Sequence, residues 1–386
     1  MDFNLTEDQL AYQEAARTFA TKELAPNAGE WDRKKHFPKD VIRKAAELGF
    51  CGLYTKDEFG GAGLSRLDAA IIFEELAMGC TATTTYITIH NMTTWMIDEY
   101  GNADTRSEWI PKMVTAEALG SYCLTEPNSG SDAAALRTKA EKRGDKYILN
   151  GVKSFVSGGG QTDVLVVMAR TGDDTPKGIS AFVVPAKAPG VSYGENEKKM
   201  GWNAQPTCEI SFENVEIPAH YLLGKEGEGF KIAMKGLDGG RINIGTCSVG
   251  TAQAAINASA KYMNERKAFG KPISQFQALA FKMADMLAET IASRQMIRLA
   301  AAKLDAKDPS ATVYCAMAKQ FATDVGSRVC NEAIQLFGGY GYTQEYPVER
   351  HFRDARVHQI LEGTNEIMRL IVSRKIFEDG ATEILR

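Results

Sequence analysis

The sequence predicts an α+β fold in which a small β domain separates two helical regions. Up to about residue 118 the apolar residues recur at helical spacing, and from Gly229 onward this spacing returns. Between these regions, short apolar runs bounded by glycine and proline have the length of strands. At the usual ~150 residues per domain, a chain of 386 residues accommodates two or three domains. We therefore predict three domains, at residues 1–118, 119–228 and 229–386.

The N-terminal region carries a clear helix start. Thr6 and Gln9 have the spacing of a capping box, and the helical spacing of apolar residues continues from there to Pro26. Two further helices are expected at residues 40–48 and 67–78, on either side of a glycine-rich loop.

The central region contains the strand signals. Asn150-Gly151, flanked by apolar residues, predicts the turn of a β-hairpin. Residues 164–168 and 179–184 are continuous apolar runs of strand length, and residues 208–212 alternate between apolar and polar. These signals predict a small all-β unit.

Two apolar stripes predict long helices in the C-terminal region. One runs along residues 279–287 and the other along residues 313–325, with apolar residues three or four positions apart. Gly338 and Gly339 follow the second stripe at the position of a helix C-cap.

Composition disfavours several classes of function. The 45 basic and 49 acidic residues form no basic block, which argues against a nucleic-acid partner. The seven cysteines share no metal-binding or disulfide spacing, which is typical of a reducing compartment. No apolar run is long enough to span a membrane, and the acidic start does not resemble a signal peptide.

No metal site is expected either. His351 and His358 lie two helical turns apart without a third ligand, so we interpret them as surface or capping histidines. The motifs of Rossmann, P-loop, zinc-protease and serine-hydrolase sites do not occur in the sequence.

Glu362 is the candidate catalytic residue. Ile360 and Leu361 precede it and suggest partial burial, which raises the pKa of a carboxyl group because the charged form is disfavoured. Gly363 allows close approach by another molecule, and Thr364 is placed to cap a following helix. A carboxylate in this setting suits proton abstraction, and the alternative is a glutamate that only complements a helix dipole.

Two loops of the central region have the composition of a ligand site. Residues 122–132 combine hydroxyls, small residues and a proline that offer donors to a polar ligand, although plain turns have a similar composition. Residues 155–160 place Phe155 before a hydroxyl and three glycines. Its ring either lies against a flat cofactor or belongs to the core before a flexible turn.

Two arginines in the C-terminal region require an explanation. Arg374 falls on the apolar face of the last predicted helix, where its charge meets either a ligand or an internal carboxylate. Arg241 follows Gly239 and Gly240 inside a predicted helix. Because glycines weaken a helix, this pair indicates close approach, either by a ligand or by a packed helix.

Taken together, these motifs resemble those of the acyl-CoA dehydrogenase family. Residues 122–132, with Tyr-Cys-Leu-Thr-Glu-Pro and Gly-Ser-Asp, resemble one family signature. Residues 335–342, followed by residues 349–354, resemble the other. The resemblance covers essentially the whole chain. It implies an N-terminal α-helical domain, a central β-barrel-like domain and a C-terminal four-helix bundle, assembled as a homotetramer.

The resemblance implies FAD as the cofactor, bound between the β domain and the bundle. The residues it assigns to the flavin part are Tyr122, Leu124, Thr125, Gly130, Ser131, Phe155, Val156 and Ser157. Those it assigns to the FAD of a neighbouring subunit are Arg266, Phe276, Gln277, Gln335, Gly338 and Gly339, with Thr364, Asn365 and Glu366 at the adenosine half. Those it assigns to the acyl-CoA are Ser131, Asp238, Arg241 and Arg374.

Glu362 matches the catalytic base of the family. The resemblance implies that it takes the α-proton of an acyl-CoA while the β-hydride passes to flavin N5, which yields a 2-enoyl-CoA. The resemblance also implies that its backbone N–H and a ribityl hydroxyl of FAD polarise the thioester carbonyl, where negative charge develops. Residues 89–92 and 239–244 resemble family members that act on short branched acyl groups. Isobutyryl-CoA, a compound of valine degradation, is therefore the favoured substrate.

Two departures from the family pattern leave this chemistry intact. Phe155-Val156-Ser157 stands where many members have Trp-Ile-Thr, and Leu361 replaces a tyrosine often found before the base. The alternatives are an acyl-CoA oxidase, another short-chain acyl-CoA dehydrogenase, or a catalytically silent scaffold that binds flavin or acyl-CoA. Glu362 argues against the scaffold and against a desulfinase-like offshoot.

The resemblance also implies an electron-transferring flavoprotein as the electron acceptor. The expected location is the cytoplasm for a bacterial protein and the mitochondrial matrix for a processed eukaryotic form.

Overall fold

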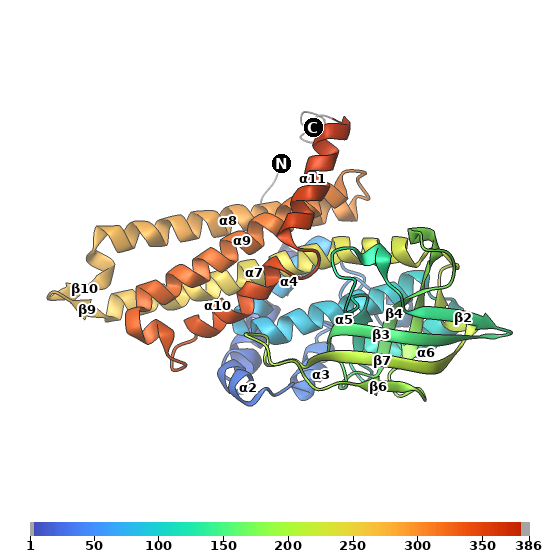
Figure 1. Ribbon diagram of the computed structural model, residues 1–386. Helices are drawn as coiled ribbons and strands as arrows, with labels where there is room; N and C mark the ends of the chain where they lie inside the picture. The colour runs from blue at the N-terminus through green and yellow to red at the C-terminus, as the bar shows by residue number, and fades with distance from the viewer. Residues whose placement is uncertain (1–3, 380–386) are drawn as a thin grey trace.

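The computed structural model describes residues 4–379 and has the α+β architecture that the sequence predicts (Figure 1). A helical region is followed by a sheet and then by long helices. Of the predicted first and last domains, residues 1–3 and 380–386 lie outside the described part of the chain.

The N-terminal region is helical, as predicted. Thr6 caps its first helix with the expected capping box, accepting from the Gln9 N–H while the Gln9 side chain accepts from the Thr6 N–H. The helices of this region are α1 (Glu7–Phe19), α2 (Ala28–Lys34), α3 (Lys39–Glu47), α4 (Arg66–Gly79), α5 (Thr81–Tyr100) and α6 (Ala103–Val114).

Helix α5 lies almost wholly inside the molecule and was not anticipated from the sequence. It is rich in threonine, and several of its hydroxyls donate to carbonyls of the preceding turn, as Thr88 does to Thr85 at 2.7 Å. Such bonds let a polar helix be buried because these hydroxyls find partners within the helix. One apolar core joins α5 and α6 to the sheet.

The central region folds into one sheet with strand order β6-β7-β3-β2-β4-β5-β8, and β1 pairs with β4. In the described residues the edge strands β6 and β8 do not pair with each other, so the sheet is open rather than a closed barrel. Its strands are β1 (Gly120–Cys123), β2 (Lys139–Arg143), β3 (Lys146–Ser157), β4 (Val164–Arg170), β5 (Ile179–Pro185), β6 (Val191–Tyr193), β7 (Thr207–Pro218) and β8 (Leu222–Leu223).

The hairpin turn predicted at Asn150-Gly151 is wrong. These residues lie inside the continuous strand β3, and the turn is at Gly144-Asp145, between β2 and β3. At Gly151 the pairing with β7 shifts register, and the φ of this glycine is 149°. The glycine therefore marks an irregularity in a long strand, a role that pairing with a distant strand decides.

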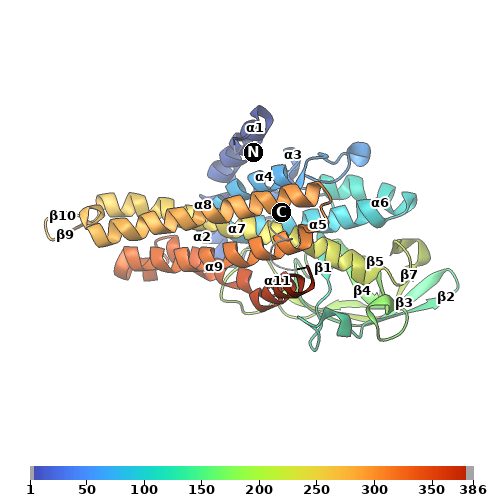
Figure 2. The ribbon, with the colours of Figure 1, turned by 90° about the horizontal axis from the view of Figure 1, so that it is seen from above.

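The C-terminal region consists mainly of long helices that run side by side (Figure 2). The helix that carries the second predicted apolar stripe ends at Phe337, and Gly338 follows with φ 60° as the predicted C-cap. The elements are α7 (Gly229–Glu265), β9 (Lys267–Ala268), β10 (Lys271–Pro272), α8 (Gln277–Asp305), α9 (Ala311–Phe337), α10 (Val348–Arg356) and α11 (Asn365–Asp379).

His351 and His358 are buried, so their interpretation as surface or capping residues is wrong. His351 is 5% exposed, and His358 is fully buried with its Nδ1 2.6 Å from the Ser248 hydroxyl. Burial lowers the pKa of both rings to about 3, so they are neutral. Among residues 4–379 no group of histidine, cysteine and carboxylate side chains has a metal-binding arrangement. Over the same span no helix is long and apolar enough to cross a membrane.

Candidate active site

Glu362 lies in the tight turn that leads into α11. Its φ is 55° and that of Gly363 is 86°, so two successive residues adopt the left-handed region. This conformation is uncommon for a glutamate and persists only where the surrounding structure holds it. Thr364 caps α11 as predicted, because its hydroxyl accepts from the Ile367 N–H at 3.3 Å.

The carboxyl group of Glu362 points into the protein. Its Oε2 is buried and has no hydrogen-bond partner. A Cβ placed on Gly240 would lie 2.2 Å from Oε2, and one placed on Gly239 would lie 2.4 Å from Nη1 of Arg66. The close approach that the two glycines indicate is thus made by Glu362 and Arg66.

The electrostatic setting suits a base. Burial raises the pKa of Glu362 to about 7, against the opposing effect of the positive charges of Arg241 and Lys319. Arg241 is itself buried and donates to Asp238 at 2.6 Å, while its Nε is without a partner. The hydroxyl of Tyr122 is also buried without a partner, and burial raises its pKa well above the usual value. A group with a pKa near 7 can accept a proton and release it again at neutral pH.

Sequence reasoning missed several residues of this site. The Arg66 guanidinium carbon lies 3.5 Å from the ring centroid of Tyr54 and 4.9 Å from that of Trp95. Arg66 is 9% exposed, and its Nη1 has no hydrogen-bond partner. Lys319, in the middle of α9, is fully buried and contacts the turn after Glu362. No local pattern marks either residue, because their partners lie far away in the sequence.

The two predicted flavin loops lie side by side. The Ser154 N–H donates to the Thr125 carbonyl at 2.8 Å, and the Ser121 hydroxyl donates to the Ser157 carbonyl at 2.7 Å. Phe155 is 66% exposed and has φ 56°, so the alternative in which it belongs to the core is wrong.

A buried ion pair, also missed, holds the first of these loops. Lys153 donates to the Glu126 carboxylate at 2.7 Å and to the Leu124 carbonyl at 3.0 Å. The Glu126 carboxylate in turn accepts from the backbone N–H groups of Arg137 and Thr138. These bonds fix the loop that carries most of the predicted flavin contacts.

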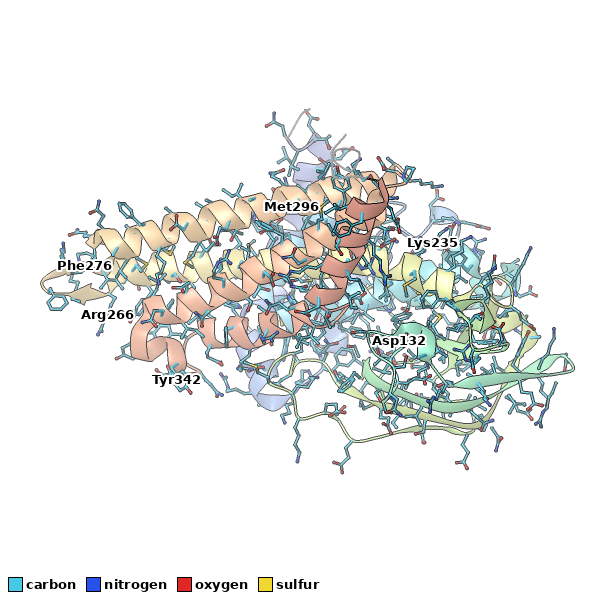
Figure 3. All side chains as sticks on the ribbon, turned by 45° about the horizontal axis from the view of Figure 1, so that its top comes forward. Asp132, Lys235, Arg266, Phe276, Met296 and Tyr342 are labelled. Atoms are coloured by element: carbon cyan, nitrogen blue, oxygen red, sulfur yellow. The ribbon has the colours of Figure 1, made fainter. Side chains whose placement is uncertain are left out.

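A second group of predicted residues lies at the far end of the helical region. Arg266, Gln335, Gly338 and Gly339 line an open hollow of about 500 Å³ between the ends of α7 and α9. Figure 3 shows Arg266, Phe276 and Tyr342 at this end and Asp132 over the sheet. Within one chain the residues predicted for the flavin ring therefore lie apart from those predicted to reach the FAD of a neighbouring subunit.

The remaining predicted residues lie near the turn or at the surface. Asn365 is 3% exposed, and its side chain bonds to Thr323 and Asp324 of α9. Ser131, Glu366 and Arg374 are exposed. The sequence placed Arg374 on a buried face, where its charge would need an internal partner. Because Arg374 is exposed, it needs no such partner.

Both groups fit a flavin dinucleotide. The sheet loops offer an exposed aromatic ring at Phe155 and partly exposed hydroxyls at Thr125 and Ser157. The far hollow combines the exposed guanidinium of Arg266 with Gly338 and Gly339, around which there is open space. A cation beside bare backbone suits a phosphate-containing ligand.

Comparison with known proteins identifies the family of this chain. Family models match in three parts: acyl-CoA dehydrogenase N-terminal domain at residues 6–117, middle domain at residues 121–215 and C-terminal domain at residues 227–377.

Individual relatives match along nearly the whole chain. The mitochondrial isobutyryl-CoA dehydrogenase of Dictyostelium discoideum is 54% identical over 376 residues, covering 97% of this chain and 90% of the relative. The structure of butyryl-CoA dehydrogenase from Megasphaera elsdenii is 39% identical with a TM-score of 0.95, covering 98% of this chain and 100% of that one. A glutaryl-CoA dehydrogenase from Mycobacterium smegmatis, solved in complex with FADH2, is 27% identical with a TM-score of 0.92, covering 98% and 96% of the two chains.

Proposed function

We propose that this chain, which belongs to the acyl-CoA dehydrogenase family and is a flavin-dependent oxidoreductase, uses Glu362 to remove the α-proton of a short branched acyl-CoA. The observation that carries the proposal is the buried, unpartnered Oε2 of Glu362 against Gly240. An unpaired carboxylate oxygen in a buried position costs free energy unless a ligand uses it.

Each residue of the site has a role in this reaction. FAD, which Thr125, Phe155 and Ser157 would help to hold, would supply the acceptor for the β-hydride. Glu362 takes the α-proton, and its backbone N–H donates to the thioester carbonyl, where negative charge develops. Burial keeps the Glu362 pKa near 7, and Arg241 keeps the ionised form accessible. The product is a 2-enoyl-CoA.

The large side chains beside Gly239 and Gly240 favour a short acyl group. Arg66, packed between Tyr54 and Trp95, lies against Gly239, next to the position where Glu362 meets Gly240. This block of three large side chains limits the length of an acyl chain whose α-carbon reaches Glu362. Leu361, smaller than tyrosine, leaves width beside the α-carbon for a methyl branch. Isobutyryl-CoA, named for the Dictyostelium relative, is the first candidate.

The wider setting follows the family resemblance. We expect a homotetramer in which Arg266 and the residues 335–339 reach the FAD of a neighbouring subunit. An electron-transferring flavoprotein is the expected acceptor. The expected location is the mitochondrial matrix for a eukaryotic source, in line with the mitochondrial enzyme of Dictyostelium discoideum, and the cytoplasm for a bacterial one.

The test is to mix purified, flavin-loaded protein anaerobically with isobutyryl-, butyryl-, octanoyl- and palmitoyl-CoA and to follow flavin absorbance. Bleaching by isobutyryl-CoA, and turnover with an artificial acceptor but not with oxygen, is the expected result. Bleaching by none of the thioesters contradicts the proposal. Rapid turnover with oxygen supports the oxidase alternative, and a higher kcat/KM for octanoyl-CoA overturns the short-chain assignment alone.

A further inference from the structure

Lys319 is a buried lysine whose ammonium group holds the turn of Glu362. It is fully buried in the middle of α9. Its Nζ donates to the Gly363 carbonyl at 2.7 Å and to Oδ1 of Asn365 at 2.9 Å. Both acceptors flank the same turn, one on the residue directly after Glu362 and one in the first turn of α11.

The turn needs such a support. Glu362 and Gly363 both adopt the left-handed region, which costs free energy for a glutamate. The hydrogen bond from the Lys319 ammonium restricts rotation of the peptide that carries the Gly363 carbonyl. If this peptide rotated away, the ammonium and the carbonyl would be left buried without each other as partners. Lys319 is thus placed to keep the peptide after Glu362 in a single orientation.

Neighbouring residues of α9 complete the support. Asp324 accepts from Asn365 at 2.7 Å and from Gln359 at 2.7 Å, on the two sides of the turn. Thr323 exchanges hydrogen bonds with the Asn365 side chain. Side chains of α9 therefore hold the segment on both sides of Glu362, and Lys319 contacts the residue directly after it.

The charge of Lys319 also acts on the carboxyl group. The positive charge opposes the effect of burial on the Glu362 pKa, and Glu362 in turn opposes the lowering of the Lys319 pKa, which burial brings to about 7. The charges of Arg241, Asp324 and Glu366 also act on Lys319, and that of Arg241 acts on Glu362. The charges of the pair in turn shift the pKa values of the facing groups His358, Tyr54 and Tyr122.

We propose that Lys319 is the positioning residue of the catalytic base: its ammonium fixes the Gly363 carbonyl and places a positive charge beside the Glu362 carboxyl group. This inference rests on the proposed function, because it assigns Lys319 a task in presenting Glu362 to the α-proton. Lys319 does not itself take a proton from the substrate.

Three variants separate position from charge. Lys319→Met removes both the donor and the charge, Lys319→Gln keeps a donor without the charge, and Lys319→Arg keeps both. Lys231→Met, at an exposed lysine of α7, is the matched control. Flavin content and melting temperature are measured for each variant, followed by kcat, KM and the pH dependence of kcat/KM with isobutyryl-CoA.

We expect Lys319→Met to lower kcat by about 10–100-fold, because small displacements of a reacting group have effects of this size. KM changes little. In Lys319→Met and Lys319→Gln the pH at which kcat/KM reaches half its maximum rises by about one unit, because a charge that favours the ionised carboxylate is gone. In Lys319→Arg and in the control this midpoint stays in place.

An unmoved midpoint in both charge-free variants overturns the proposal, as does a loss of activity that only follows loss of flavin. If Lys319→Met does not fold, Lys319→Gln is read in its place. Titration of the Glu362 carboxyl by infrared difference spectroscopy, with Glu362→Gln as the reference, needs no substrate. It tests Lys319 even if no acyl-CoA reacts, so failure of this inference and failure of the proposed function are distinguishable.

Discussion

The turn of Glu362 and the far hollow of the helical region are built on opposite principles. At the turn, residues of one chain bury and hold the functional group: Lys319 and Asn365 fix the backbone, and Gly240 receives the carboxylate. At the hollow, Arg266, Gln335, Gly338 and Gly339 are exposed, and nearby aromatic residues are uncovered, with Phe269 95% and Tyr342 87% exposed.

This difference indicates that a single chain can position Glu362 by itself, whereas the hollow at Arg266 is left open. The buried groups that hold the turn, Lys319, the Gly363 carbonyl and Asn365, find partners in their own chain, so the proposed base is positioned without a second subunit. The exposed aromatic residues and the cation at the hollow are typical of a surface that a ligand or another subunit covers. We therefore expect changes at the turn to alter the rate and changes at the hollow to alter cofactor retention.

The largest expected effect is that of Glu362→Gln at the turn. Glutamine keeps the size of the side chain and removes the base, so kcat falls by at least the ~10²–10⁴-fold that general-base catalysis contributes. Stopped-flow measurement of flavin reduction by isobutyryl-CoA is the test. Glu213→Gln, at an exposed glutamate of β7, is the control and stays active. A Glu362→Gln protein that keeps half of the normal rate would contradict the assignment of the base.

At the hollow, Arg266→Ala is expected to weaken FAD retention by about 10–100-fold, because hydrogen bonds to charged groups contribute roughly 1.5–3 kcal/mol. The melting temperature falls with it, since a ligand that binds only the folded state stabilises that state. Fluorescence of released flavin and differential scanning calorimetry measure both effects. Arg143→Ala, at an exposed arginine of β2, is the control. Normal flavin affinity in Arg266→Ala, or an active monomer that is fully loaded with FAD, contradicts the composite site.

A change beside Gly239 tests whether Arg66 limits the length of the acyl chain. Arg66→Met is expected to raise kcat/KM for hexanoyl-CoA relative to isobutyryl-CoA by about tenfold. The reason is that apolar pockets discriminate by about 1–3 kcal/mol per methylene and the block beside Gly239 becomes smaller. Arg43→Met, at an exposed arginine of α3, is the control. An unchanged ratio between the two thioesters would show that Arg66 does not limit chain length.

The smallest effect needs no mutation. Glu362 must be ionised to accept a proton, and burial raises its pKa to about 7. Activity therefore rises with pH as the carboxyl group loses its proton, by about tenfold in kcat/KM between pH 6 and pH 8. Flavin retention at the hollow is expected to be flat over the same range. A rate that falls across this window would exclude Glu362 as the titrating base.

The sequence by itself determined what depends on neighbours along the chain. The order of helices, sheet and helices follows from the spacing of apolar residues, and the caps at Thr6, Thr364 and Gly338 follow from the residue type at each helix end. Glu362 was also found locally, from the apolar pair before it and the glycine after it. The partial burial of Glu362 and the bend allowed by Gly363 depend on residues within a few positions of it.

Only the tertiary structure decided which distant residues meet. Asn150-Gly151 has the local pattern of a turn, but pairing of β3 with β7 makes it part of one strand. Lys319 lies 44 residues from the carbonyl that it holds, and Arg66 lies far in sequence from Gly239. Burial of a charge or of a histidine depends on what packs over it, and that packing comes from segments that no local pattern connects.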